Sequence, residues 1–171
     1  MSVYVANPTS RKSIRDLTYA IRRALDLHEE KFFPIVQFLE LLLPKISPSF
    51  SMEVVPIEEL KYEYGVTFPE KNVIRLREDV YLNAIEGIAR DRFTVAHEIG
   101  HLFLHKPGSI ALARSQKADS IPAFKSPEWQ ANTFAAELLA PAHLIKGLSI
   151  KEVALSCGVS LDVARIQIKN I

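Results

Sequence analysis

Residues 90–104 set the strongest limit on the architecture of this chain. Small and apolar side chains recur through them at helical spacing, at Phe93, Ala96, Gly100 and Phe103. The sequence Lys-Pro-Gly at positions 106–108 follows as a stop signal. The segment is therefore predicted to form a helix with one buried face, and the rest of the chain has to supply the core around it.

The remaining periodicity predicts further helices and a few short strands. We expect helices over residues 11–27, 34–43, 79–85 and 126–140, and a hairpin of two helices over residues 149–171. Pro34 suits the first turn of the second helix, and Pro44 is expected to end it. We expect strands over residues 50–55, 66–68 and 73–76, and a long loop over residues 107–126. With 171 residues, these elements fit one α+β domain, residues 1–171.

Composition argues against several classes of protein. The chain has 21 Lys and Arg against 20 Asp and Glu, so no overall basic field attracts nucleic acid or a membrane surface. No apolar run is long enough for a signal peptide or a membrane span. The single cysteine, Cys157, cannot form an internal disulfide, which favours a reducing, cytoplasmic location. Glycine-rich phosphate loops and nucleophile elbows are absent from the sequence.

The sequence His97-Glu98-Ile99-Gly100-His101 lies within the helix predicted over residues 90–104 and follows the pattern H-E-x-x-H. Four residues advance about 400° along a helix, so His97 and His101 share one face, one turn apart. Both imidazoles can then reach one Zn²⁺ ion, with another divalent cation such as Mn²⁺ as the alternative. Glu98, next around the helix, can take a proton from an activated water. The competing interpretation is two solvated histidines beside an ordinary glutamate.

Catalytic zinc usually takes three protein ligands, so a third residue is needed. The predicted helix over residues 126–140 offers Glu128 and Glu137. Its apolar stripe consists of Ala131, Phe134, Ala135, Leu138 and Leu139. Glu128 borders this stripe, whereas Glu137 lies about 180° from Glu128, on the outer face. We therefore predict that Glu128 is the third ligand and that Glu137 faces outward.

Two polar residues near these ligands have open roles. Asn132, one turn after Glu128, can orient a ligand imidazole through its other nitrogen, or can simply bond the backbone. His105 follows His97 by eight residues, a rise of about 12 Å on a straight helix, which is too far for the same ion. We expect His105 to be a residue of the helix C-terminus, with contact to a substrate or transition state as the alternative.

The stretch of residues 93–101, followed by Leu104-His105, resembles the active helix of ImmA/IrrE-type metallopeptidases. The stretch of residues 128–141 is similar to the second signature of that family, in which the third zinc ligand stands four residues before an Asn. That position is Glu128. The resemblance covers residues 10–165, loosely before residue 88. It implies a gluzincin-like, minimal zincin fold with the active-site helix packed against a small mixed sheet and further helices around it.

The resemblance also implies an activity and a partner. Members of the family are zinc endopeptidases that are encoded beside helix-turn-helix repressors and cleave them, which relieves repression in mobile elements or stress responses. We therefore expect a repressor-type protein substrate, encoded nearby. The oxyanion of the tetrahedral intermediate needs a stabilising donor, for which Tyr64, Tyr81, His105 and His143 are candidates.

Two alternatives to a peptidase remain: a DNA-binding protein and a binding module that has lost the peptidase activity. The hairpin over residues 149–171 resembles a DNA-binding helix-turn-helix. However, Asp162 stands where the second helix would meet phosphates, and the basic residues nearby are few: Lys151, Arg165 and Lys169. We do not expect direct nucleic-acid binding, because such binding draws much of its affinity from basic side chains. The other alternative is a regulatory module that binds a protein partner without cleaving it.

Overall fold

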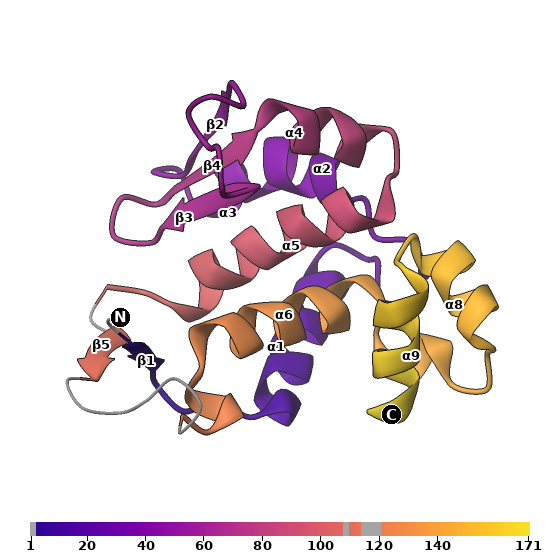
Figure 1. Ribbon diagram of the computed structural model, residues 1–171. Coiled ribbons are helices and arrows are strands. Elements are labelled where there is room, and N and C mark those ends of the chain that lie inside the picture. Colours follow the sequence, from indigo (N-terminus) through magenta and orange to yellow (C-terminus); the bar gives the residue numbers. More distant parts are fainter. Residues whose placement is uncertain (1–2, 108–109, 114–120) are drawn as a thin grey trace.

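The computed structural model describes residues 3–107, 110–113 and 121–171 (Figure 1). The longer helices are α1 (Arg11–Ala24), α4 (Glu78–Ile85), α5 (Ala89–Leu104), α6 (Pro127–Leu139), α8 (Ile150–Cys157) and α9 (Leu161–Lys169). The shorter ones are α2 (Ile35–Gln37), the π-helical η1 (Phe38–Leu42), α3 (Leu43–Ile46), the 3-10 turn η3 (Ala123–Lys125) and α7 (Ala142–Ile145). The strands are β1 (Val3–Ala6), β2 (Ser51–Val55), β3 (Gly65–Phe68), β4 (Val73–Arg77) and β5 (Ile110–Ala113). This is the mostly helical α+β fold predicted from the sequence.

The strands β2, β4 and β3 form a small mixed sheet in that order. The central strand β4 is parallel to β2 and antiparallel to β3. A turn at residues 69–72 closes the β3–β4 hairpin, and Asn72 adopts a φ of 56°, which Asn tolerates well. Ile74 and Leu76 of β4 are fully buried. The sheet lies on one side of α5, with β3 as the edge strand nearest that helix (Figure 1).

Helix α5 runs through the middle of the molecule, between the sheet and α6 (Figure 1). Its residues Val95, Ala96 and Ile99 are buried, and so is the predicted apolar stripe of α6. Helix α6 begins as its sequence indicates, because Pro127 occupies the first turn and the Ser126 hydroxyl accepts a hydrogen bond from the Trp129 N–H. In the part of the chain that the structure describes, no helix is long and apolar enough to cross a bilayer.

The prediction of one helix over residues 34–43 is wrong in its details. Pro34 caps α2 instead of lying in its first turn, and Pro44 does not end the helical path. In η1 the Leu43 N–H donates to the Phe38 carbonyl, one residue farther back than in an α-helix. This wider turn allows Pro44 to lie in the first turn of α3, where its missing N–H costs little.

The sequence analysis missed a second, two-stranded sheet. Strand β1 pairs antiparallel with β5, with Val3 opposite Ala113 and Ala6 opposite Ile110. Strand β5 lies inside the loop predicted over residues 107–126, so that prediction is wrong for residues 110–113. Residues 108–109 and 114–120 of the predicted loop lie outside the described residues. Strands of four residues carry too little alternation to be recognised from sequence.

The prediction that Glu137 faces outward is also wrong, because this residue is fully buried. Its Oε1 accepts a hydrogen bond from Arg11 Nη1 at 3.0 Å, and its carboxylate accepts two from Arg15 Nε and Nη2, at 3.0 and 3.1 Å. Arg15 also donates to the Asn170 carbonyl at 2.6 Å. The prediction failed because α1 packs against α6 and covers the side taken for solvent.

The C-terminal hairpin of α8 and α9 is fixed to α5 by Arg92. This side chain is almost fully buried and donates to the carbonyls of Gly158 and Phe33, at 3.1 and 2.9 Å. Gly158 ends α8 with a φ of 64°, and a Cβ atom there would lie 2.8 Å from the Phe32 ring. The hairpin is therefore packed against the helix that carries the H-E-x-x-H motif.

Replacing Glu137 with Ala should destabilise the fold, because two guanidinium groups would lose their common buried acceptor. Since both Arg side chains are partly exposed, we expect a loss of about 2–3 kcal/mol in the free energy of unfolding. Urea denaturation measures it. The exposed Glu58→Ala variant is the control and should stay within about 0.5 kcal/mol of the parent. Equal stabilities for the two variants would contradict the assignment.

Candidate metal and catalytic centre

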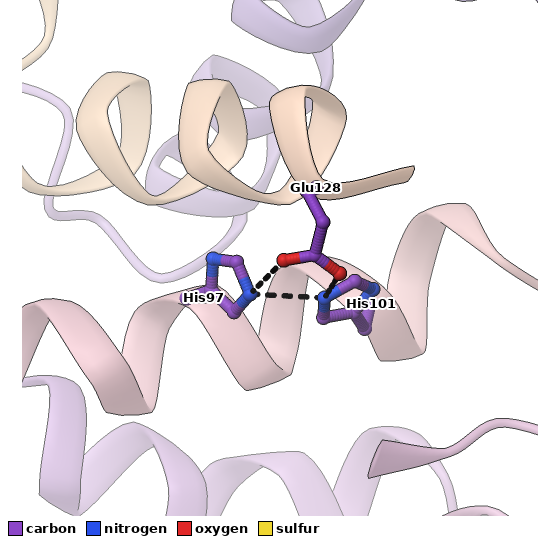
Figure 2. A group of neighbouring side chains, drawn as sticks. All are labelled: His97, His101 and Glu128. Carbon is purple, nitrogen blue, oxygen red and sulfur yellow. Dashed lines mark hydrogen bonds and ion pairs between the residues drawn. The ribbon is translucent and has the colours of Figure 1, made fainter. Parts of the chain in front are cut away.

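The two histidines of the H-E-x-x-H motif lie side by side on α5. His97 and His101 point in the same direction, with their Nε2 atoms 2.9 Å apart (Figure 2). Each side chain is 16% exposed, so the rings are half-buried but reach the surface of the helix. This is the arrangement expected from a separation of four residues on a helix.

The third side chain comes from α6. Glu128 lies in the first turn of that helix and extends toward both imidazoles (Figure 2). Its Oε2 is 3.4 Å from His97 Nε2, and its Oε1 is 3.4 Å from His101 Nε2. The three residues offer ligand atoms that all lie within 4.8 Å of one another. The Glu128 side chain is 70% exposed, so solvent reaches the group from that side.

The close approach of α5 and α6 explains why Glu128 can reach the histidines. Gly100 lies between them on α5, and a Cβ atom added there would be 3.1 Å from the Phe134 Cβ and 3.2 Å from the Ala131 Cα. A larger residue at this position would push the helices apart. The glycine inside the motif therefore allows the two helices to approach this closely.

This group of side chains fits a zinc ion. Two imidazole nitrogens and one carboxylate form a known ligand set for catalytic zinc, and two ligand atoms of a tetrahedral zinc lie about 3.3 Å apart. The Nδ1 of His97 is 2.8 Å from Asn132 Oδ1, so the imidazole donates there and turns an Nε2 lone pair toward the group. Without a cation, that lone pair would face the carboxylate of Glu128 across 3.4 Å.

The electrostatics of the group also suit a cation. The imidazoles of His101 and His97, whose Nε2 atoms lie 3.4 Å from its oxygens, hold the pKa of Glu128 well below its usual range. Burial alone would lower the pKa of His97, but the neighbouring carboxylates of Glu128 and Glu98 raise it on balance. The carboxylates thus stabilise positive charge at the point where the ligand atoms meet.

Glu98 occupies the position predicted for a general base. It is 6% exposed and lines the same cleft as the histidines. The Thr67 hydroxyl of β3 lies 2.6 Å from Glu98 Oε2. Burial raises the pKa of Glu98, and the hydrogen bond from Thr67 partly opposes that rise. A carboxylate with a raised pKa is suited to accept a proton from water and release it again.

The sequence analysis did not identify Thr67 or its neighbour Gly65. A Cβ atom at Gly65 would lie 2.9 Å from Glu98 Cγ, so only glycine lets the strand pack this closely against the helix. Both residues are more than 30 positions away from Glu98 in the sequence. No local signal reveals them, because their role arises only when β3 packs against α5.

A cleft of about 510 Å³ opens in front of these residues, between β3 on one side and α5 and α6 on the other. Tyr64 lies in the cleft wall, half-exposed, with the Arg77 guanidinium 4.5 Å from the centre of its ring. Of the four candidates for oxyanion stabilisation, Tyr64 is the one that lines the cleft.

The structure places two other candidates away from the cleft. The Tyr81 hydroxyl on α4 donates to Glu40, and both residues line a separate pocket. His143 donates from Nε2 to the His28 carbonyl at 2.8 Å and packs edge-on against Tyr19.

His105 lies behind the candidate ligand His101, not in the cleft. It is 2% exposed, and burial lowers its pKa to about 4, so the ring is neutral. Its Nδ1 is 2.9 Å from His101 Nδ1, and its Nε2 is 2.9 Å from Oε1 of Gln130, a residue that the sequence analysis did not identify. In this structure, His105 contacts a candidate ligand residue and is not among the residues that line the cleft.

Comparison with known proteins agrees with this geometry. The family profile of the IrrE N-terminal-like domain matches residues 52–168, which include the histidine pair, Glu98 and Glu128. The comparison with curated proteins found no match. The profile spans most of the chain and contains every residue of the candidate centre. The chain therefore belongs to the ImmA/IrrE metallopeptidase family.

Proposed function

We propose that this metallopeptidase is a cytoplasmic, zinc-dependent endopeptidase that cleaves a helix-turn-helix repressor and so relieves repression. One observation carries the zinc peptidase assignment: His97, His101 and Glu128 converge beside the buried carboxylate of Glu98. The repressor substrate is supported by the resemblance to family members that cleave such proteins. The cytoplasmic location is supported by the single, buried Cys157.

His97, His101 and Glu128 would hold the ion. When bound, the cation would supply Lewis acidity, which polarises a peptide carbonyl and makes water more acidic. Glu98 accepts the proton of the attacking water and then donates it to the leaving amine nitrogen. Because Thr67 occupies Oε2, we assign this proton transfer to Oε1. Tyr64 is the candidate donor to the oxyanion.

The shape of the cleft supports a peptide substrate. Strand β3 forms one wall and is the edge strand of its sheet, paired with β4 on its other side. Edge strands present backbone N–H and C=O groups to which an extended peptide can add. A substrate bound in this way would pass in front of Glu98.

The C-terminal hairpin does not favour nucleic-acid binding. Arg165 Nη1 is 2.6 Å from Asp162 Oδ1, so one of its few basic residues already has an acidic neighbour. Exposed apolar side chains, among them Leu155 and Ile166, share the hairpin surface. Phosphate contacts need several basic side chains, which this surface does not offer.

The Glu98→Gln variant should bind zinc like the parent but lose at least about 10²-fold in cleavage rate, because the general base is removed and the ligands remain. The substrate is the helix-turn-helix repressor encoded nearest to the gene, and gel electrophoresis with mass spectrometry measures its cleavage. A fully active variant would refute the role of Glu98. If the parent cleaves quenched fluorescent peptides but not the repressor, the repressor assignment fails and the peptidase assignment stands.

Replacing Glu128 and Glu137 separately should split metal binding from stability. Glu128→Ala removes one of three protein ligands, so zinc affinity should fall steeply while the free energy of unfolding of the metal-free protein changes little. Glu137→Ala, on the same helix, should keep its zinc and lose stability. Competition with a chelator measures zinc affinity. If Glu128→Ala retains the zinc affinity of the parent, the proposed ligand set is wrong.

Replacing Thr67 with Val should lower kcat while KM and zinc affinity stay the same, because the hydroxyl orients Glu98 and touches no ligand. A hydrogen bond to a charged group contributes about 1.5–3 kcal/mol, which corresponds to a fall of about 10- to 100-fold. The Thr67→Ser variant keeps the hydroxyl and should recover most of the rate. If Thr67→Ser is as slow as Thr67→Val, the threonine serves packing instead.

A further inference from the structure

A chain of hydrogen bonds leads from the back of the candidate centre into the protein interior. His101 Nδ1 lies 2.9 Å from His105 Nδ1, and His105 Nε2 lies 2.9 Å from Gln130 Oε1. Gln130 Nε2 in turn lies 2.8 Å from the carbonyl oxygens of both Asn7 and Phe124. His105 and Gln130 are almost completely buried. We call these three side chains, His101, His105 and Gln130, the relay.

The two carbonyl groups fix the direction of the relay. Only the NH₂ group of an amide can donate, and Gln130 uses both of its N–H bonds on the carbonyls of Asn7 and Phe124. A flipped amide would place its oxygen against those two carbonyl oxygens. The Gln130 oxygen therefore faces His105, where it can only accept, and the hydrogen on His105 must be on Nε2.

The orientation of Gln130 also determines which nitrogen of His101 carries the hydrogen. A neutral imidazole with its hydrogen on Nε2 has a lone pair on Nδ1, so His105 accepts at Nδ1. The hydrogen in the 2.9 Å contact between the two rings must then belong to His101 Nδ1. Neutral His101 is left with a lone pair on Nε2, the atom that faces His97 and Glu128.

We infer that Gln130 and His105 are positioning residues that hold His101 in the tautomer with a free Nε2 lone pair. This inference rests on the proposed function only in taking His101 as a metal ligand. The orienting group of a ligand histidine decides which of its nitrogens is protonated. In this chain that group is a second imidazole, and its own direction is set by an amide on α6.

Without Gln130, the direction of the hydrogen bond between His105 and His101 could reverse. His105 could then donate from Nδ1 to His101 Nδ1, which would move the His101 hydrogen to Nε2. That hydrogen would point at His97 Nε2, only 2.9 Å away, and would occupy the position of the cation. The buried amide thus blocks a tautomer that is satisfied by hydrogen bonds but cannot bind metal.

Nitrogen-15 NMR of the full chain tests the inference directly. Long-range proton–nitrogen spectra of the metal-free protein at alkaline pH distinguish the two neutral tautomers of each histidine. We expect the hydrogen on Nδ1 of His101 and on Nε2 of His105. In the Gln130→Met variant, which has similar shape but no amide, a large share of His101 should shift to the Nε2-protonated tautomer. His101 protonated on Nε2 in the parent would overturn the inference without any variant.

Zinc affinity gives the second readout. Loss of a group that orients a ligand typically lowers metal affinity about 10- to 100-fold, and we expect a fall in this range for Gln130→Met. The matched control is Gln167→Met, since Gln167 is also fully buried and donates to the Ala140 carbonyl at 2.9 Å, away from the centre. It should keep parental tautomers and affinity.

The outcomes separate the relay from the proposed function. If Gln130→Met keeps both the parental tautomers and the parental zinc affinity, the relay has no positioning role. If both variants lose affinity equally, buried glutamines matter only for stability and the inference fails. If no peptide is cleaved by the parent, the proposed function fails, while the tautomers and the zinc affinity still decide on the relay.

Discussion

The candidate metal centre forms because α5 and α6 approach to within backbone contact at Gly100. Without that approach, His97 and His101 would be a pair of imidazoles with no carboxylate in reach. Three arginines of α1 hold α6 in this place. Arg22 of α1 is fully buried and donates to the Leu138 carbonyl at 3.1 Å, and Arg11 and Arg15 converge on Glu137. The position of Glu128, the candidate third ligand, is therefore set from the far side of its helix.

The two glutamates of α6 show how one residue type can serve two purposes on one helix. Glu128 is largely exposed and has imidazoles as neighbours, whereas Glu137 is fully buried between guanidinium groups. A carboxylate beside a candidate metal site must stay accessible to solvent and substrate. A carboxylate that joins helices gains from burial only when its partners satisfy it, which Arg11 and Arg15 do.

The sequence predicted what local geometry determines. Spacing along one helix indicated the histidine pair and Glu98, and the angle around a second helix selected Glu128. Thr67 and Gln130 were missed because their partners lie far away in the sequence and meet only after the elements pack. The path through η1 and the pairing of β1 with β5 were missed for a related reason, since short elements receive their stability from their surroundings.

Both imidazoles are oriented at Nδ1, and both orienting amides come from α6. Asn132 contacts His97 directly, whereas Gln130 reaches His101 through His105. This second imidazole lies at the C-terminal end of α5, one turn after His101. Helix α6 thus supplies the carboxylate and, directly or through one intermediate ring, the acceptors for both histidines. Because these contacts share one helix, a shift of α6 along α5 would disturb all of them at once. The packing of these two helices is therefore what decides whether the centre can bind a cation.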